Sequence, residues 1–213
     1  MYDLLYKELR LAAHPSVFVF LFMGALVLIP AYPYGVVIFF GALGLFQTFM
    51  FDRETRDVFY TALLPVRKGD GGRGKLLLAV FVQLVQLVLS LPFAFLRTLY
   101  LPEGNPVGIE ANAAFYGFAL ALYGVFNLVF FARFYRTAYR VGAAFLTALP
   151  PLVLGVCAME ALVHVPALAW LDGVDAASLV RQLPVLAAGG LVYALCCVLA
   201  CRVGVRRFER VDL

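Results

Sequence analysis

Residues 76–96 read LLLAVFVQLVQLVLSLPFAFL, and only two glutamines, one serine and one proline interrupt this apolar run. A helix needs about 20 such residues to cross the hydrocarbon core of a bilayer. The apolar residues do not alternate with a period of two, so the run predicts a spanning helix and not a strand of a barrel. Lipid offers no partner to open backbone groups, so we expect every spanning segment to be helical.

The composition extends this interpretation to the whole chain. Of its 213 residues, 64% are hydrophobic and 14% are charged, whereas about a quarter of the residues of a typical soluble domain are charged. The surplus apolar surface must therefore face lipid. We predict an all-α membrane protein with a single transmembrane domain, residues 1–213.

Charged or Pro- and Gly-containing connections separate six expected spanning segments. These cover approximately residues 15–29, 35–51, 76–96, 113–131, 141–163 and 183–201. Pro150-Pro151 predicts a kink in the fifth segment, because proline removes a backbone donor. Residues 164–181 are too apolar for a free loop and too interrupted to span, which predicts short re-entrant or interfacial helices on the outer side.

The first 13 residues carry an apolar stripe and a charged stripe at helical spacing. We interpret residues 1–13 as an amphipathic elbow helix on the inner leaflet, because His14-Pro15 marks a break before the first apolar run. The alternative is that these residues simply begin the first spanning helix.

Basic residues divide by side of the predicted topology. Of the seventeen Lys and Arg residues, fifteen fall on one side, and Arg97 and Arg181 fall on the other. Cytoplasmic flanks are enriched in Lys and Arg, so we expect a multi-pass protein of the plasma membrane with both termini cytoplasmic. The net charge of +4 comes from this excess of basic residues on one side. Such an excess directs membrane insertion and attracts anionic lipid, so we expect no nucleic-acid partner.

The sequence gives little sign of catalysis. Gly69–Lys75 fits G-x-x-x-x-G-K, but Leu76 follows where a phosphate-binding loop needs Ser or Thr, and no strand precedes it. We interpret the stretch as a flexible glycine-rich connection. No set of Ser, His and acidic residues can be assembled on one side, and the four cysteines fall in predicted spans as apolar filler. We expect no catalytic residue, no metal site and no cofactor on this chain.

Polar residues inside the spans are candidates for a substrate path. Glu160 is the one acidic residue well inside an apolar segment, where burying a carboxylate costs at least ~2.5 kcal/mol. It either faces a substrate path or reaches the outer headgroups near His164. Gln83, Gln86 and Asn127 are uncharged candidates for the same path, although such residues more often bridge helices.

The loop between the second and third spans, residues 52–75, has a distinct pattern. Charged residues are followed by an aromatic apolar turn and then by Leu-Pro-Val and a basic pair. Phe59, Leu63 and Leu64 would share one face of a short amphipathic helix, which either docks in a groove of a soluble partner or lies on the inner leaflet. The candidate coupling residues are Asp57, Phe59, Tyr60, Leu63, Leu64, Pro65, Arg67, Lys68 and Asp70.

Three stretches resemble the ABC-2 type exporter permeases, the membrane subunits of ATP-binding cassette exporters. They are Leu5–Leu11 with His14-Pro15, Ile29–Tyr34, and Leu64–Asp70. The chain is most similar to the small permeases that export phenol-soluble modulins and related amphipathic peptides. The resemblance covers most of the chain by topology and roughly the first 90 residues by motif.

The resemblance implies an elbow helix, six spanning helices and two short outer helices before the last one. It also implies pairing with a second permease, as a homodimer or heterodimer, and with two cytosolic ATPases that bind ATP and Mg²⁺. This chain would then be no enzyme itself. Residues 57–70 would form the coupling helix that docks on an ATPase, although Gly69–Gly74 departs from the family pattern.

Two other functions are compatible with the sequence. One is a secondary transporter or channel that acts without an ATPase, although the spans show no inverted repeat and carry few charges. The other is a structural membrane protein. The favoured expectation is a permease subunit that exports an amphipathic substrate, a peptide by the resemblance.

Overall fold

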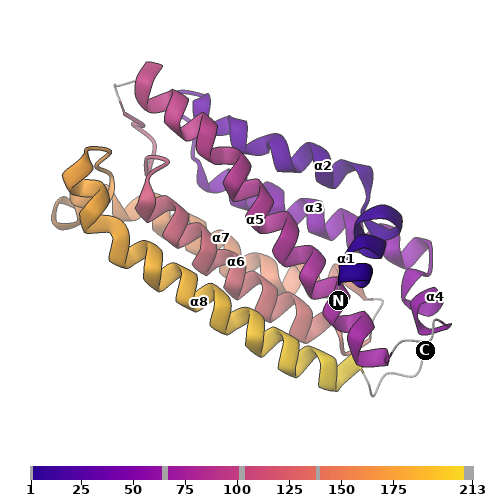
Figure 1. The fold of residues 1–213 in the computed structure, drawn as a ribbon. Coiled ribbons are helices and arrows are strands. Elements are labelled where there is room, and N and C mark those ends of the chain that lie inside the picture. Colours follow the sequence, from indigo (N-terminus) through magenta and orange to yellow (C-terminus); the bar gives the residue numbers. More distant parts are fainter. Residues whose placement is uncertain (1, 64–66, 101–103, 138–139, 209–213) are drawn as a thin grey trace.

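The computed structural model describes residues 2–63, 67–100, 104–137 and 140–208 (Figure 1). Every regular element in these ranges is a helix. Five helices are long and apolar enough to cross a membrane, and a bent pair near the start of the chain raises the number to six if it counts as one span. The predicted all-α class is therefore confirmed in the described residues, and the long apolar helices are compatible with the predicted membrane protein. The count of six spans depends on that bent pair.

The long helices run alongside one another in an elongated bundle (Figure 1). They are α3 (Gly35–Glu54), α5 (Lys68–Tyr100), α6 (Ala113–Phe134), α7 (Val141–Leu162) and α8 (Ala176–Phe208). The short helix α4 (Asp57–Leu63) lies between α3 and α5 in the chain. The start of α1 and the end of α8 lie at the same end of the bundle, which we call the termini end, and the opposite end is the loop end.

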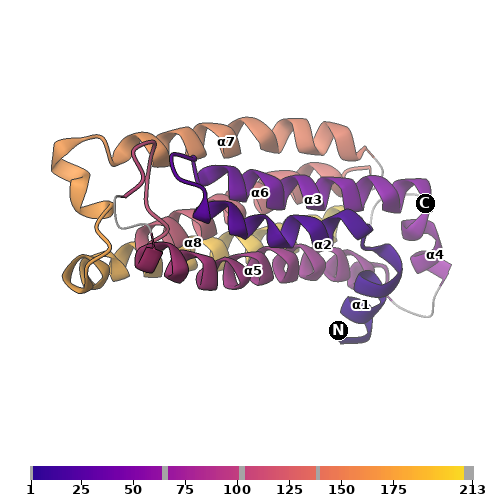
Figure 2. The ribbon, with the colours of Figure 1, turned by 90° about the horizontal axis from the view of Figure 1, so that it is seen from above.

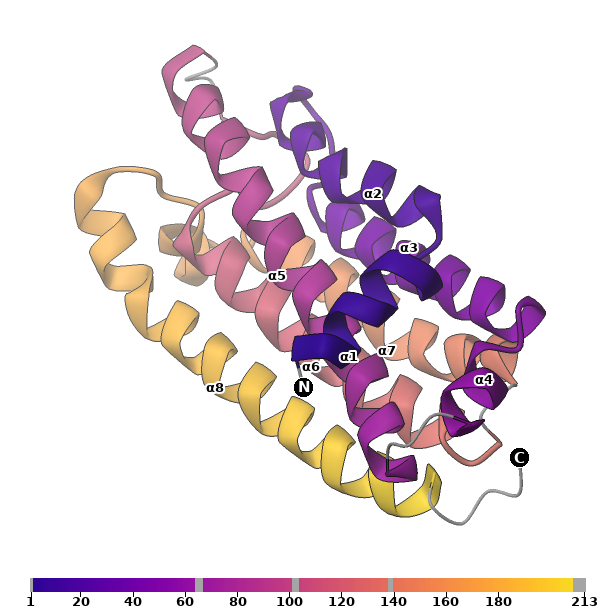
Figure 3. The ribbon, with the colours of Figure 1, turned by 45° about the vertical axis from the view of Figure 1, so that its right-hand side comes forward.

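The chain begins with two short helical segments at a steep angle. They are α1 (Tyr2–Lys7) with the π-helical turn η1 (Glu8–Ala12), and α2 (Pro15–Leu21) with the 3-10 helix η2 (Phe22–Leu28). The angle between Leu4–Leu11 and Pro15–Leu28 is 98°, and Figure 3 shows α1 crossing in front of α5. His14 Nδ1 accepts a hydrogen bond from the Ser16 N–H at 3.2 Å and so caps α2. The break predicted at His14-Pro15 is present.

Two spans are longer than the sequence predicts. α5 starts at Lys68 instead of residue 76, and α8 covers 176–208 instead of 183–201. The interpretation of Gly69–Gly74 as a flexible connection is therefore wrong, because these residues are helical. The buried Tyr135 hydroxyl donates a hydrogen bond to the Gly72 carbonyl oxygen and so ties this part of α5 to the end of α6. Tertiary packing here outweighs the poor helix propensity of glycine.

The predicted outer segment 164–181 is divided between two elements. Pro166–Leu171 forms the short 3-10 helix η3, as expected of an interfacial segment, whereas the residues from Ala176 onward already belong to α8. Asp175 Oδ2 accepts a hydrogen bond from the Ser178 N–H at 3.0 Å and begins that helix. α7 is a single helix across Pro150-Pro151.

α6 forms the centre of the bundle. Figure 2 shows it between α7 and α8, and it packs against both of them. Near the termini end its buried phenylalanines stack along one face, with ring centroids 5.4 Å apart for Phe126 and Phe130 and 5.8 Å apart for Phe130 and Phe134. Phe49 of α3 packs edge-on against this stack.

The contact between α6 and α8 depends on a pair of glycines. A Cβ atom at Gly189 would overlap the carbonyl oxygen of Gly117, and a Cβ atom at Gly117 would lie 2.7 Å from the carbonyl oxygen of Val185. The two backbones therefore touch directly, as small residues allow in membrane helices. The sequence pattern of Gly117 and Ala121 hints at this close packing.

We predict that Gly189→Ala lowers the unfolding free energy by about 1–3 kcal/mol, because the added methyl group forces α8 away from α6. The adjacent Gly190→Ala is the matched control, since no atom lies within 4 Å of a Cβ built there. Thermal unfolding in detergent micelles measures both. Equal melting temperatures for the two variants would contradict the backbone contact.

Candidate functional site

A buried ion-pair cluster joins four segments at the termini end. Its centre is the ammonium group of Lys75 on α5. The residue Lys75 is 4% exposed. Lys75 Nζ donates hydrogen bonds to Glu8 Oε2 at 2.8 Å, Asp52 Oδ2 at 2.5 Å and Asp57 Oδ2 at 2.6 Å. These carboxylates come from η1, from the last turn of α3 and from the first residue of α4. One side chain thus connects the elbow, two long helices and α4.

A second lysine completes the cluster. Lys7 Nζ lies 3.0 Å from Glu8 Oε1, 2.7 Å from Asp57 Oδ2 and 2.8 Å from Thr61 Oγ1. Two ammonium groups therefore face three carboxylates. The Asp52 Oδ1 atom is buried without a hydrogen-bond partner among the described residues. Removal of one partner from a buried set of this kind costs more than the loss of a surface ion pair, because the remaining charges stay desolvated.

In this arrangement the three carboxylates surround an ammonium group. Oxygen atoms of Glu8, Asp52 and Asp57 lie within 4.8 Å of one another, a spacing that fits a cation. However, Lys75 Nζ is hydrogen-bonded to all three, and its positive charge would repel a second cation at the same place. The ammonium group itself is the cation that this site holds.

α4 has two different faces. Asp57 and Thr61, one turn apart, are buried against the lysines of the cluster. Phe59 and Leu63, also one turn apart, are 50% and 68% exposed, and Tyr60 between them is 63% exposed. The short helix is therefore held to the bundle by polar contacts on one side and presents an apolar, aromatic surface on the other. We call Phe59, Tyr60 and Leu63 the α4 face.

Electrostatics favour the charged form of Asp57. Burial alone would raise the pKa of this carboxyl group, but the ammonium groups of Lys75 and Lys7 outweigh it and lower the pKa from its ordinary value. The Asp57 carboxylate therefore stays ionised when it holds α4 in place.

The remaining coupling candidates have different positions. Arg67 is exposed just before α5, and Lys68 is the first residue of that helix. Asp70 lies in its first turn, where it accepts a hydrogen bond from Arg73 Nη1 at 2.8 Å. Leu64 and Pro65 lie outside the described residues. The structure thus brings Asp57 into the ion-pair cluster and leaves Phe59, Tyr60 and Leu63 exposed.

The uncharged polar candidates form a buried network inside the bundle. Gln83 of α5 and Asn127 of α6 exchange two hydrogen bonds of 2.8 Å, and Tyr193 of α8 donates to Gln83 Oε1 at 3.0 Å. Gln86 Nε2 donates to the carbonyl oxygens of Phe20 and Val37. These side chains bridge helices, as expected for most such groups. Their role in a substrate path stays a prediction.

Glu160 joins two segments at the loop end. Its Oε1 atom accepts a hydrogen bond from the Gly35 N–H at 2.6 Å, and its Oε2 atom accepts one from the Ile109 N–H at 3.0 Å. The carboxylate therefore satisfies the start of α3 and fixes the loop before α6. This contact gives the side chain a structural role at its place in α7, and its part in a substrate path also stays a prediction.

A second buried ion pair lies at the loop end. The predicted third span, residues 76–96, leaves Arg97 outside the helix, which is wrong, because Arg97 belongs to α5 and is 2% exposed. Its guanidinium group binds both carboxylate oxygens of Glu110, at 3.0 and 3.2 Å, and lies over the Tyr34 ring. The Glu110 N–H in turn donates to Asp172 Oδ1 at 2.7 Å.

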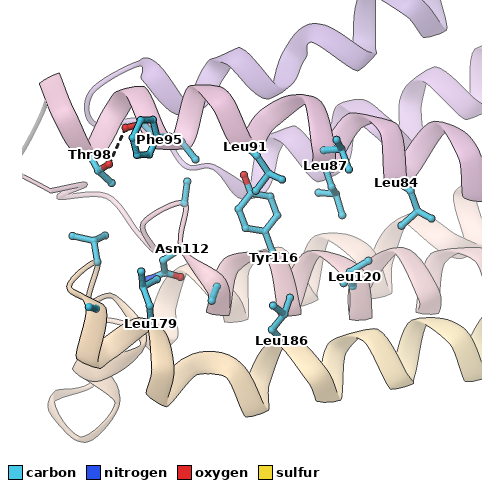
Figure 4. A pocket seen from close by; sticks show the side chains of 16 residues that line it. Leu84, Leu87, Leu91, Phe95, Thr98, Asn112, Tyr116, Leu120, Leu179 and Leu186 are labelled. Atoms are coloured by element: carbon cyan, nitrogen blue, oxygen red, sulfur yellow. Dashed lines mark hydrogen bonds between the residues drawn. The ribbon is translucent and has the colours of Figure 1, made fainter.

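An apolar groove opens between α5 and the pair α6–α8 in the loop-end half (Figure 4). Its volume is about 810 Å³. Its three hydrogen-bonding side chains, Thr98, Asn112 and Tyr116, are each bonded within the protein. An occupant would therefore be held by apolar contacts. Glu160 and the polar network residues do not line this groove.

The sequence predicts a short helix that begins at Asp57, but the expected extent of residues 57–70 is wrong, because α4 covers Asp57–Leu63 and Lys68 already belongs to α5. The sequence does not predict the partners that hold α4. Lys7, Glu8, Asp52 and Lys75 count in the sequence only as charges flanking apolar runs. One signal was present: Lys75 directly adjoins the apolar run that starts at Leu76, and Asp52 directly follows another. Charges at such boundaries need a partner when the helix ends are buried.

Comparison with known proteins identifies no relative of this chain. No family model matches the chain, and neither a curated protein nor a solved structure matches it. The functional argument therefore depends on the residues and their geometry.

We predict that Lys75→Met lowers the unfolding free energy by about 3–5 kcal/mol, because three buried carboxylates lose their common partner. Arg73→Gln is the control, since its ion pair with Asp70 is solvent-exposed and should contribute less than about 1 kcal/mol. Unfolding in detergent micelles measures both. Adding Asp52→Asn to Lys75→Met should recover part of the loss. Equal stability of Lys75→Met and Arg73→Gln would contradict the cluster.

The Asp57 carboxylate also predicts a pH dependence. Because its folded-state pKa is lowered, its contribution to stability is complete above the unfolded-state value of about 4 and is lost as the pH falls through the folded-state pKa. The wild type should melt above Asp57→Asn at neutral pH, and the margin should shrink below about pH 4. Glu54→Gln, at an exposed acid near α4, should show no such margin. A margin that grows on acidification would contradict this assignment.

Proposed function

We propose that this chain is the membrane-spanning permease subunit of an ATP-binding cassette exporter, and that α4 is the helix on which a cytosolic ATPase acts. The observation that carries the proposal is the two-sided character of α4. A docking helix must expose an apolar face to its partner and be fixed to the bundle behind it. The α4 face meets the first need, and the Asp57 and Thr61 contacts meet the second.

The ion-pair cluster supplies a route from α4 to the spanning helices. Asp57 is bonded to Lys75 on α5 and to Lys7 on α1, and Lys75 also binds Asp52 on α3. Movement of α4 by closure of paired ATPases would thus act on three segments at once. A rigid group of hydrogen-bonded charges transmits such movement better than a flexible loop would.

The remaining parts of the proposal follow from the sequence. With fifteen of seventeen basic residues on the termini side, we place the termini end and α4 in the cytoplasm and the bundle in the plasma membrane. ATP and Mg²⁺ would bind the ATPase partner, and this chain would pair with a second permease. The proposed cargo, an amphipathic peptide, rests on the resemblance of the N-terminal motifs.

The test is affinity purification of the tagged chain in a gentle detergent, followed by mass spectrometry. We expect an ATPase with a phosphate-binding loop to be recovered with the wild type. Phe59→Ala with Leu63→Ala should reduce that recovery tenfold or more, since interface apolar anchors commonly contribute over about 1 kcal/mol each. Leu191→Ala with Leu195→Ala, an exposed apolar pair one turn apart on α8, is the matched control and should retain the ATPase.

Three results would overturn the proposal. An unchanged ATPase recovery with Phe59→Ala and Leu63→Ala would remove the docking role of α4. Equal losses in both double variants would indicate a general effect on the detergent complex. A wild-type homo-oligomer without any ATPase would favour a secondary transporter or channel.

A further inference from the structure

A basic cleft lies at the termini end between α6, α7 and α8. Its volume is about 340 Å³, and it is shallow and widely open at the surface. One face of α6 forms its floor, while Thr147 of α7 and Arg207 of α8 stand on either side. The cleft exists because α6 packs against both neighbours, whereas α7 and α8 make little contact with each other.

Three arginines surround this cleft. Arg133 lies in the last turn of α6, Arg136 lies in the turn that follows α6, and Arg207 lies in the last turn of α8. All three are exposed. Within the described ranges of the chain, none of them forms an ion pair with a carboxylate. Three guanidinium groups on one small cleft create a strongly positive site for a phosphate group.

Arg207 has one internal contact that orients it. It donates a hydrogen bond from Nη1 to the carbonyl oxygen of Ala132, in the last turn of α6. This contact partly satisfies the end of α6 and leaves the other donors of the guanidinium group available. The planar group is thereby held beside the mouth of the cleft.

The floor of the cleft is apolar. It consists of one face of α6 that carries Leu128, Val129 and Ala132. Arg133, the residue after Ala132, lies on the same face. Leu128 and Arg133 are separated by about 7.5 Å along the helix axis. A ligand that fits has a phosphate at the arginines and a hydrocarbon portion that runs along α6 toward the middle of the bundle.

We propose that this cleft binds the headgroup of an anionic phospholipid, with an acyl chain lying on the α6 face. The membrane that surrounds the bundle contains such molecules at high local concentration. Basic pockets between spanning helices recognise lipid headgroups through the same combination of charge and apolar contact. The site is separate from the α4 face and does not depend on the proposed exporter function.

The test uses purified, delipidated protein and native mass spectrometry with added dioleoylphosphatidylglycerol or dioleoylphosphatidylcholine. We expect one tightly held phosphatidylglycerol per chain and no comparable phosphatidylcholine. Arg133→Gln with Arg136→Gln should weaken phosphatidylglycerol binding by roughly thirtyfold. Arg207 is left intact because it also contacts α6. Arg202→Gln with Arg206→Gln removes the same charge from exposed residues of α8 that do not line the cleft, and it should bind as the wild type does.

Each other outcome overturns the proposal. Equal weakening of phosphatidylglycerol binding by both double variants would show a diffuse attraction between the termini end and lipid. Competition by inorganic phosphate at the concentration of the lipid would show a site for a free anion. Equal binding of both lipids would show that the arginines do not select charge. Matching melting temperatures of the lipid-free proteins verify that both double variants are folded.

Discussion

The hydrogen bonds of one buried ammonium group, Lys75 Nζ, determine how the termini end of this protein is assembled. An unpaired charge at this depth would be unstable, so Lys75 must have carboxylates around it. The chain supplies three, and each comes from a different element: the elbow, α3 and α4. The neutralisation of one lysine therefore ties the first helical segment and α4 to the termini end of the bundle.

The polarity of α4 follows from that constraint. Asp57 and Thr61 must face Lys7 and the cluster, and helical geometry then directs Phe59 and Leu63 away from it. The apolar α4 face is thus a consequence of how the helix is anchored. It gives the bundle a defined surface at the end where the basic residues gather. The loop end is organised by different contacts, the Arg97–Glu110 pair and the Glu160 carboxylate.

The sequence predicts those features that depend on local pattern. Apolar runs of membrane length give the long helices, and His14-Pro15 gives the break before α2. It fails where long-range packing decides. Gly69–Gly74 is helical although glycine disfavours helices. A contact that holds this stretch, the Tyr135 hydroxyl on the Gly72 carbonyl oxygen, joins residues far apart in the sequence, so no local signal reveals it. Arg97 is buried because Glu110 pairs with it across a loop, whereas charge counting assigns it to the outer surface.

The candidate site shows the same division. The α4 face could be predicted, since Phe59 and Leu63 lie one turn apart in a charged loop. The ion-pair cluster could not be, since Lys7 and Asp57 are 50 residues apart and Lys75 and Glu8 are 67 residues apart. Charges that flank apolar runs resemble ordinary insertion signals until the fold shows which of them meet.

The central claim, that the α4 face docks on a cytosolic ATPase, is tested most directly by a photoreactive benzoyl-phenylalanine in place of Phe59. Irradiation of intact cells followed by mass spectrometry identifies what lies against this side chain. If the α4 face docks on an ATPase, the expected result is a covalent product with an ATPase that contains a phosphate-binding loop. Products formed with phospholipid alone would contradict it, because α4 would then lie on the membrane surface.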